Sequence, residues 1–169
     1  RAALQPIFAN PRTAKVAHNA SYDLGMLARY GLNVAGDLVD TMVAEWLIDP
    51  GSRGLGLKDL AWTRLKTEMT PISALIGTGK NQITMDKVDI EKLYRYGCQD
   101  SDVTFRLARL LGEKLKEKEL TGLFEDMEMP LVPILADMEA AGVAIDTKLL
   151  AQLSTEMERS LAGLTQRIF

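Results

Sequence analysis

The sequence has few of the residues that build disulfides and zinc sites. It contains one cysteine, Cys98, and one histidine, His18. An internal disulfide and a Cys/His set for structural zinc are therefore both excluded. We expect Cys98 to be a small buried residue and His18 to be a hydrogen-bonded residue at a strand end. A single cysteine also fits a reducing, intracellular compartment.

Positive charge and long apolar runs are lacking too. The chain has 20 Lys and Arg against 23 Asp and Glu, a net charge of −3, so it offers no broad basic face to duplex nucleic acid. No apolar run approaches the roughly 20 residues that span a bilayer, and no signal-peptide pattern opens the chain. We expect a soluble, cytoplasmic protein with no membrane partner.

A nucleotide-binding P-loop is also missing, although residues 77–80 read GTGK. That motif would need glycine at position 74 and Ser or Thr at position 81. The residues there are Ala74 and Asn81. We therefore interpret this stretch as a loop.

The apolar residues that are present, within a chain that is 47% hydrophobic, predict helices interrupted by two short strands. Strands are expected near residues 14–17 and 38–39. Helices are expected at residues 2–8, 20–30, 42–48, 57–65, 86–118, 123–141 and 147–168. Gly97 could break the long helix in two, and Pro130 predicts a kink or a restart.

This order implies an α/β unit, but two short strands cannot form a full sheet. The chain starts at Arg1 and ends inside a helical pattern. We therefore expect a piece of a longer protein, with strands missing upstream. A charged run at residues 113–119 suggests a boundary between two regions near residue 119.

Two pentapeptides carry the candidate chemistry: residues 19–23 read NASYD and residues 96–100 read YGCQD. In each, a hydrogen-bonding residue precedes an aspartate by four positions. On a helix, that spacing places both side chains on one face, about a turn apart. Each pair can therefore point into one pocket.

Hydrolysis of a phosphodiester by two metal ions needs carboxylates that converge on the ions. Asp23 and Asp100 could ligate Mg²⁺ or Mn²⁺, which prefer oxygen ligands. Tyr96 could hold the attacking water through its hydroxyl, and Asn19 could hydrogen-bond a sugar or a phosphate.

Each of these residues also has an ordinary structural interpretation. A single helical aspartate is usually a solvated charge, Tyr96 could lie at a core edge, and Asn19 could be the N-cap of its helix. Asp40 could be a spare ligand, but a structural N-cap is the favoured role. Tyr22 could stack on a base or merely pack.

Taken together, the two pentapeptides resemble the second and third motifs of the DEDD superfamily of 3′–5′ exonucleases, in the branch with a tyrosine in the third motif. The resemblance extends through residues 15–27, 40–42, 79–84, 95–104 and 127–146. These segments look like the bacterial family A DNA polymerases, the DNA polymerase I family. Almost the whole chain is covered.

The resemblance implies a ribonuclease-H-like 3′–5′ exonuclease fold, N-terminally truncated, at residues 1–118. Residues 119–169 would be the helical start of the polymerase domain, near its thumb. Asn19 and Asp23 match the second motif, and Tyr96 and Asp100 the third. Tyr22 falls where the family contacts the single-stranded 3′ end of the DNA primer, the implied partner.

The sequence departs from the family in one large respect. The first motif, Asp-x-Glu on a strand, is absent from residues 1–169. The resemblance assigns two further carboxylates to that motif, so we expect the isolated chain neither to polymerise nor to degrade DNA at a useful rate.

Two alternatives stay open. One is a ribonuclease-D-like 3′–5′ exoribonuclease, although residues 127–146 resemble the polymerase junction instead. The other is a catalytically silent structural or interaction domain. In that case the apolar face of residues 149–168 could pair two copies into a homodimer.

Overall fold

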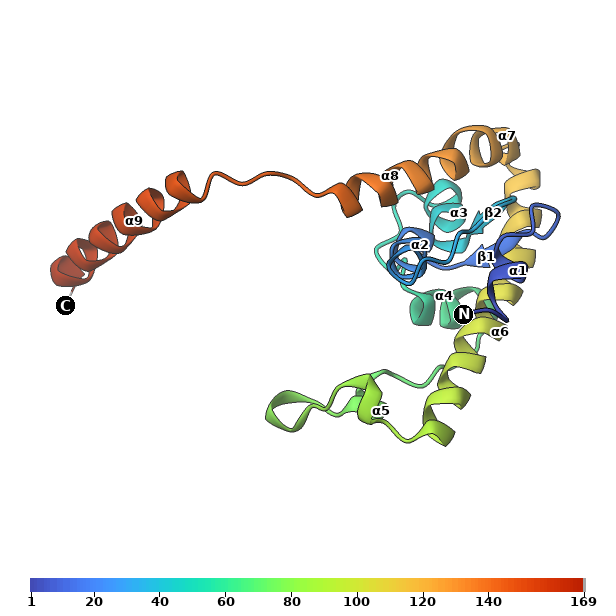
Figure 1. The fold of residues 1–169 in the computed structure, drawn as a ribbon, viewed down its shortest axis with the longest axis horizontal. Helices are drawn as coiled ribbons and strands as arrows, with labels where there is room; N and C mark the ends of the chain where they lie inside the picture. The colour runs from blue at the N-terminus through green and yellow to red at the C-terminus, as the bar shows by residue number, and fades with distance from the viewer. Residues whose placement is uncertain (169) are drawn as a thin grey trace.

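The computed structural model describes residues 1–168. A compact body holds the two strands and most of the helices (Figure 1), while an arm that carries α5 and the final helix α9 extend away from it. The arm and α9 lie on the same side of the body in this view. The candidate functional residues all belong to the body.

The body is built around a parallel pair of strands. Strand β1 (Lys15–Ala17) pairs with β2 (Leu38–Asp40), with Val16 opposite Val39. Helix α2 (Ala20–Arg29) connects them, and Gly31, with a φ of +62°, closes it where a glycine is favoured. Because parallel strands end at the same edge, the residues that follow β1 and β2 meet there. Both strands match the sequence prediction.

Further helices complete the body. They are α1 (Gln5–Phe8), α3 (Thr41–Ile48), α4 (Leu57–Leu65), α6 (Ile90–Glu117), α7 (Thr121–Leu123) and α8 (Met129–Ala141). The last helix, α9 (Thr147–Ile168), lies outside the body. Helices α3 and α4 both pack on α6, whose apolar stripe includes the fully buried Val103, Leu107 and Leu111. Thus α6 is the central support of the body.

The sequence left open a break at Gly97, and the structure has none there. Helix α6 is continuous from Ile90 to Glu117, because a single glycine costs a helix interior only about 1 kcal/mol. The Asp89 side chain caps the start by accepting a hydrogen bond from the Glu91 amide. Buried residues in the last four turns anchor the rest of the helix.

Residues 70–82, which include the GTGK stretch interpreted as a loop, contain two short helical turns, α5 (Ser73–Ile76) and a 3₁₀ turn, η1 (Gly79–Asn81). A second 3₁₀ turn, η2 (Met85–Lys87), precedes α6. These turns form the arm in Figure 1.

The predicted restart at Pro130 is confirmed. A π-helical turn, η3 (Phe124–Glu128), precedes α8, and Pro130 lies in the first turn of α8. The π-helical turn shifts the backbone pairing just before Pro130, with the Met129 amide donating to the Phe124 carbonyl, where Pro130 has no N–H to donate. Helix α8 packs along α2, so the residues after 119 contribute to the same core.

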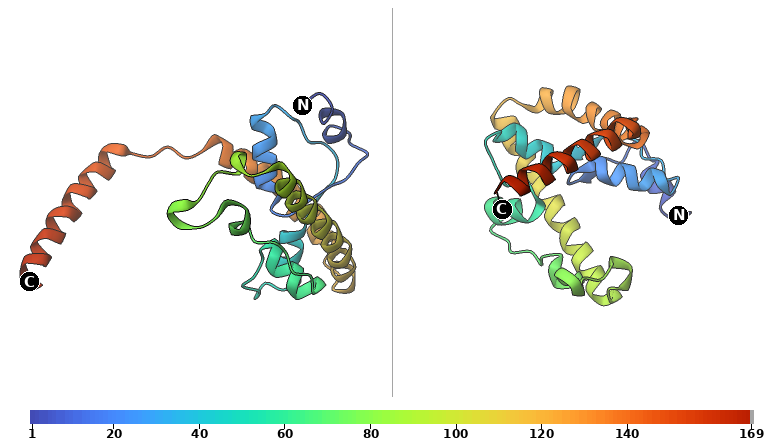
Figure 2. Two further views of the ribbon diagram at one scale, coloured as in Figure 1. Left: turned by 90° about the horizontal axis from the view of Figure 1, so that it is seen from below. Right: turned by 90° about the vertical axis from the view of Figure 1, so that its left-hand side faces the viewer.

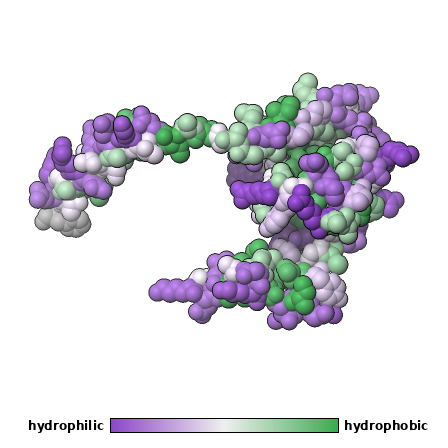
Figure 3. Space-filling view, in the orientation of Figure 1, coloured by the Kyte–Doolittle hydropathy of each residue, from purple (hydrophilic) through white to green (hydrophobic). Residues whose placement is uncertain are grey.

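Helix α9 stands apart from this core, and the view from below shows the same separation (Figure 2). None of its described residues is buried. The segment at residues 142–146 joins it to α8 and forms the apolar bridge seen in Figure 3, with Val143 and Ile145 exposed. Asp146 caps α9 by accepting hydrogen bonds from the amides of Lys148 and Leu149.

Up to residue 168, no helix combines the length and apolar character needed to cross a membrane.

Candidate functional site

A pocket of about 410 Å³ lies where the end of β1 meets α2, α4 and α6. Asp23 from α2 and Asp100 from α6 both line it, together with His18 and Thr104. The fold therefore brings the two predicted ligands, far apart in the sequence, to one cavity.

Asp40 fixes the position of α2. Its carboxylate, only 3% exposed, accepts hydrogen bonds from the amides of Asn19 at 3.0 Å and Ala20 at 2.6 Å. It also accepts one from the Met42 amide at 2.8 Å. One carboxylate thus caps the starts of α2 and α3. Its structural role was the favoured prediction, and it is confirmed.

His18 belongs to the same strand-end network. Its Nδ1 lies 2.8 Å from Thr41 Oγ1, and that hydroxyl donates to the Ala17 carbonyl. The pKa of His18 is lowered by burial, which outweighs the opposing effects of the Asp40 charge and the Leu55 carbonyl. The prediction of a hydrogen-bonded strand-end histidine is confirmed.

Both pocket aspartates have a raised pKa. The pKa of Asp23 is raised by burial and further by the negative charge of Asp40. The pKa of Asp100 is raised by burial, against the opposing effects of the Lys58 charge and a hydrogen bond from Tyr96. Both carboxylates line one pocket, where their oxygens could contribute ligands to a divalent cation.

The donor set fits a hard divalent cation in part. Carboxylate oxygens are the ligands that Mg²⁺ and Mn²⁺ prefer. Within residues 1–168, however, no three His, Cys, Asp or Glu side chains lie close enough together to hold a metal ion. Asp23 and Asp100 would therefore contribute two ligands of a larger set.

Tyr96 lies one turn before Asp100 on α6 and accepts a hydrogen bond from Lys58 on α4, at 3.0 Å between Nζ and Oη. Lys58 was not predicted as a site residue. Its residue type and its place in an ordinary amphipathic helix give no signal, because only the packing of α4 against α6 brings it to Tyr96.

Tyr96 is not among the residues that line the pocket, and neither are the other two predicted site residues, Asn19 and Tyr22. Asn19 has a left-handed backbone with a φ of 65°, outside α2, so the one-face argument does not apply to it. It occupies the N-cap position, but its side chain caps no amide and instead accepts a hydrogen bond from Ser21 Oγ. Tyr22 is 65% exposed, so packing in the core is not its role.

The prediction of a buried Cys98 is wrong, because its thiol is exposed. The buried stripe of α6 begins only at Val103, and the first turns of the helix project toward the arm.

Residues 1–116 match a family model described as 3′–5′ exonuclease. DNA polymerase I of Chloroflexus aurantiacus is 39% identical over 99% of this chain and 18% of its own length. DNA polymerase I of Rhizobium leguminosarum is 35% identical over 98% of this chain and 16% of its own length. The chain thus spans less than a fifth of these relatives.

Among solved structures, the POL domain of Pol1 from M. smegmatis, in complex with a DNA primer-template and dNTP, matches with a TM-score of 0.74. Its sequence is 28% identical, and the match covers 94% of this chain and 24% of that protein. The observed fold, a mostly helical body with a small parallel sheet, agrees with these relatives. Because the family model covers most of the residues, the chain belongs to this family of 3′–5′ exonucleases.

Proposed function

We propose that this chain is the proofreading 3′–5′ exonuclease region of a bacterial DNA polymerase I, an enzyme of DNA replication and repair. The region would remove nucleotides from the single-stranded 3′ end of a DNA primer. The observation that carries the proposal is the convergence of Asp23 and Asp100 on one pocket, in a chain of the exonuclease family.

The finer description of the fold belongs to the same proposal. We infer that the two-stranded sheet is part of a larger ribonuclease-H-like sheet, of which residues 1–118 supply the later elements. Val16 of β1 is 36% exposed, which supports this inference because a strand inside a larger sheet would be covered. Residues 119–169 would begin the polymerase domain.

In the proposed site, Asp23 and Asp100 ligate divalent cations, Mg²⁺ or Mn²⁺. When bound, the cations would supply Lewis-acid stabilisation of the phosphodiester and activation of water. Tyr96, one turn from Asp100, orients the water through its hydroxyl. Tyr22 and Asn19, exposed at the start of α2, would contact the incoming strand.

Two expectations from the sequence remain predictions: the inactivity of the isolated chain and the homodimer. The isolated chain is expected to be inactive, because the pocket contributes two carboxylates and the full ligand set requires more. The homodimer through α9 has no supporting observation.

The test uses the full-length polymerase and 5′-labelled single-stranded oligonucleotides of DNA and RNA, with Mg²⁺ or with a chelator. We expect stepwise shortening of DNA from its 3′ end that requires the metal. Asp100→Asn should slow it more than about 100-fold, since even partners outside the ligand shell typically contribute 10–100-fold.

The matched control is Asp102→Asn. Asp102 lies two residues further along α6, is exposed, and pairs only with Arg106, so its neutralisation should leave the rate unchanged. Faster digestion of RNA than of DNA would indicate an exoribonuclease instead. A full rate in Asp100→Asn would contradict the proposed site.

A further inference from the structure

Lys58 contacts the hydroxyl of Tyr96, a residue of the proposed site. It lies in the first turn of α4, and its Nζ donates a hydrogen bond to the Tyr96 hydroxyl on α6 at 3.0 Å. The same Nζ is 5.0 Å from the centroid of the Tyr96 ring. The nearest contact is therefore with the hydroxyl oxygen and not with the ring face.

This contact limits the directions in which the hydroxyl proton of Tyr96 can point. A tyrosine hydroxyl can accept hydrogen bonds and has one proton to donate. An ammonium group can only donate, so Tyr96 accepts from Lys58 and its own proton must point elsewhere. Asp100 lies one turn after Tyr96 on α6, so the Asp100 side of the hydroxyl is the side on which its proton can be donated.

Lys58 supplies a positive charge near a pocket whose charged side chains are acidic. None of the described residues that line the pocket is Lys or Arg. The pocket contains two carboxylates, and the charge of Asp40 also acts on Asp23. The Lys58 charge acts on Asp100 in the opposite sense. Lys58 is half-buried, so its ammonium is not simply a solvated surface group.

We propose that Lys58 is a positioning residue of the exonuclease site: by donating to the Tyr96 oxygen it holds the hydroxyl in the orientation that directs its one proton to the attacking water on the Asp100 side. This proposal rests on the proposed function and deepens it. Without Lys58, the hydroxyl is free to rotate, and fewer bound complexes have the water correctly held. The chemical step then slows, while binding of the strand is unaffected.

The experiment measures kcat and KM for single-stranded DNA digestion by the full-length polymerase and its Lys58→Met and Lys58→Arg variants. We expect Lys58→Met to lower kcat by about tenfold, the lower end for groups that orient a site from outside, with KM within about twofold. Lys58→Arg should restore most of the rate, because it keeps a charged donor. Lys66→Met, at the other end of α4, removes an exposed charge and should change nothing.

Two further measurements separate positioning from other roles. In a Tyr96→Phe background, Lys58→Met should cause no additional loss, because the two residues act through one hydroxyl. Fluorescence anisotropy with labelled single-stranded DNA in chelator should give the same Kd for wild type and Lys58→Met. The thermal unfolding midpoints of all variants should agree, which excludes misfolding as the cause.

Three results would overturn the proposal: an unchanged kcat in Lys58→Met, a raised KM or Kd with normal kcat, or losses that multiply with Tyr96→Phe. The second of these would make Lys58 a phosphate contact. Asp100→Asn is measured in parallel. If Asp100→Asn keeps full activity, the proposed function fails; if it is inactive while Lys58→Met is normal, only the role of Lys58 fails.

Discussion

At the scale of single residues, Asp40 determines the geometry of the site without lining it. It holds the amides of Asn19, Ala20 and Met42, and so fixes the direction in which α2 leaves β1. Asp23 lies one turn into that helix. The placement of a candidate ligand therefore depends on a buried side chain at the end of the other strand.

Asp40→Ala should lower the free energy of unfolding by about 2 kcal/mol or more, because each helix cap is typically worth about 1 kcal/mol. Urea titration measures the change. Asp37→Ala is the matched control, since Asp37 is exposed and only its backbone carbonyl is engaged, by the Lys15 amide. Equal losses in the two variants would contradict the capping role.

His18 predicts a pH dependence of stability. Burial lowers its pKa below the ordinary 6.5, so the folded state favours the neutral ring. As the pH falls through 6.5, the unfolded chain takes up a proton before the folded one, and stability decreases. At higher pH both states are neutral and the effect vanishes.

We therefore expect the wild-type free energy of unfolding, in metal-free buffer, to fall between pH 7.5 and pH 5.5 by more than that of His18→Gln. The chain has no other histidine, so the difference between the two slopes isolates this ring. Equal slopes would show that the ring is not held neutral.

Local spacing was sufficient to predict that Asp23 and Asp100 each lie on a helix. Their shared pocket was expected only from the family resemblance, because spacing within one helix does not show which helices meet. Asn19 failed the same rule because a left-handed backbone takes it out of the helix. Lys58 was missed because its role depends on contact between two helices, which no pattern within one helix reveals.

At the scale of elements, α6 carries the third motif and most of the core. Its first turns, which hold Tyr96 and Asp100, have no buried residues, whereas its later turns are buried from Val103 onward. The sequence showed the apolar stripe correctly but overestimated the effect of Gly97, because glycine weakens a helix without ending it.

Gly97→Ala should stabilise the protein by about 0.5–1 kcal/mol, since a methyl group there would meet no atom within 4 Å. Thermal or urea unfolding measures the gain. The contrasting variant is Gly36→Ala, which should destabilise the protein. Gly36 has a φ of +89°, and the added Cβ would lie 2.7 Å from the Pro11 carbonyl oxygen. A loss of stability in Gly97→Ala would contradict the uninterrupted helix.

At the scale of the whole molecule, the two long helices after residue 119 differ in whether they pack on the body. Helix α8 packs on α2 and shares its core, whereas α9 projects away with its apolar face exposed. The sequence predicted a boundary near residue 119 from a charged run, and the boundary stays a prediction. Charge patterns mark solvated helix ends but do not show what packs afterwards.

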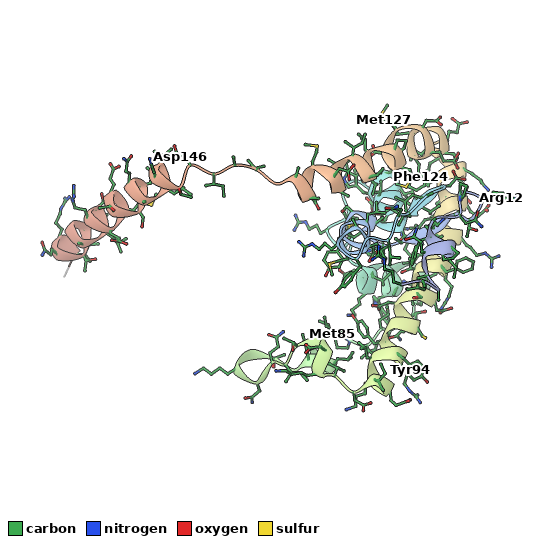
Figure 4. The ribbon with its side chains drawn as sticks, in the orientation of Figure 1. Arg12, Met85, Tyr94, Phe124, Met127 and Asp146 are labelled. Atoms are coloured by element: carbon green, nitrogen blue, oxygen red, sulfur yellow. The ribbon has the colours of Figure 1, made fainter. Side chains whose placement is uncertain are left out.

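Two residues of the π-helical turn, Phe124 and Met127, test how strongly residues 119–141 pack on the body (Figure 4). Phe124 is 5% exposed and Met127 is 57% exposed. Phe124→Ala should lower the free energy of unfolding by about 3–5 kcal/mol, and Met127→Ala by little. A small effect of Phe124→Ala would mean that residues 119–141 fold independently of the exonuclease body.

The central claim is that Asp23 and Asp100 serve one metal-dependent site. The most direct measurement is the rate of 3′-end digestion of single-stranded DNA by the full-length polymerase, as a function of Mg²⁺, for Asp23→Asn, Asp100→Asn and the double variant. If the two carboxylates act as a unit, each single variant should be about as inactive as the double. Substantial activity in either single variant, or losses that simply multiply, would contradict a shared site.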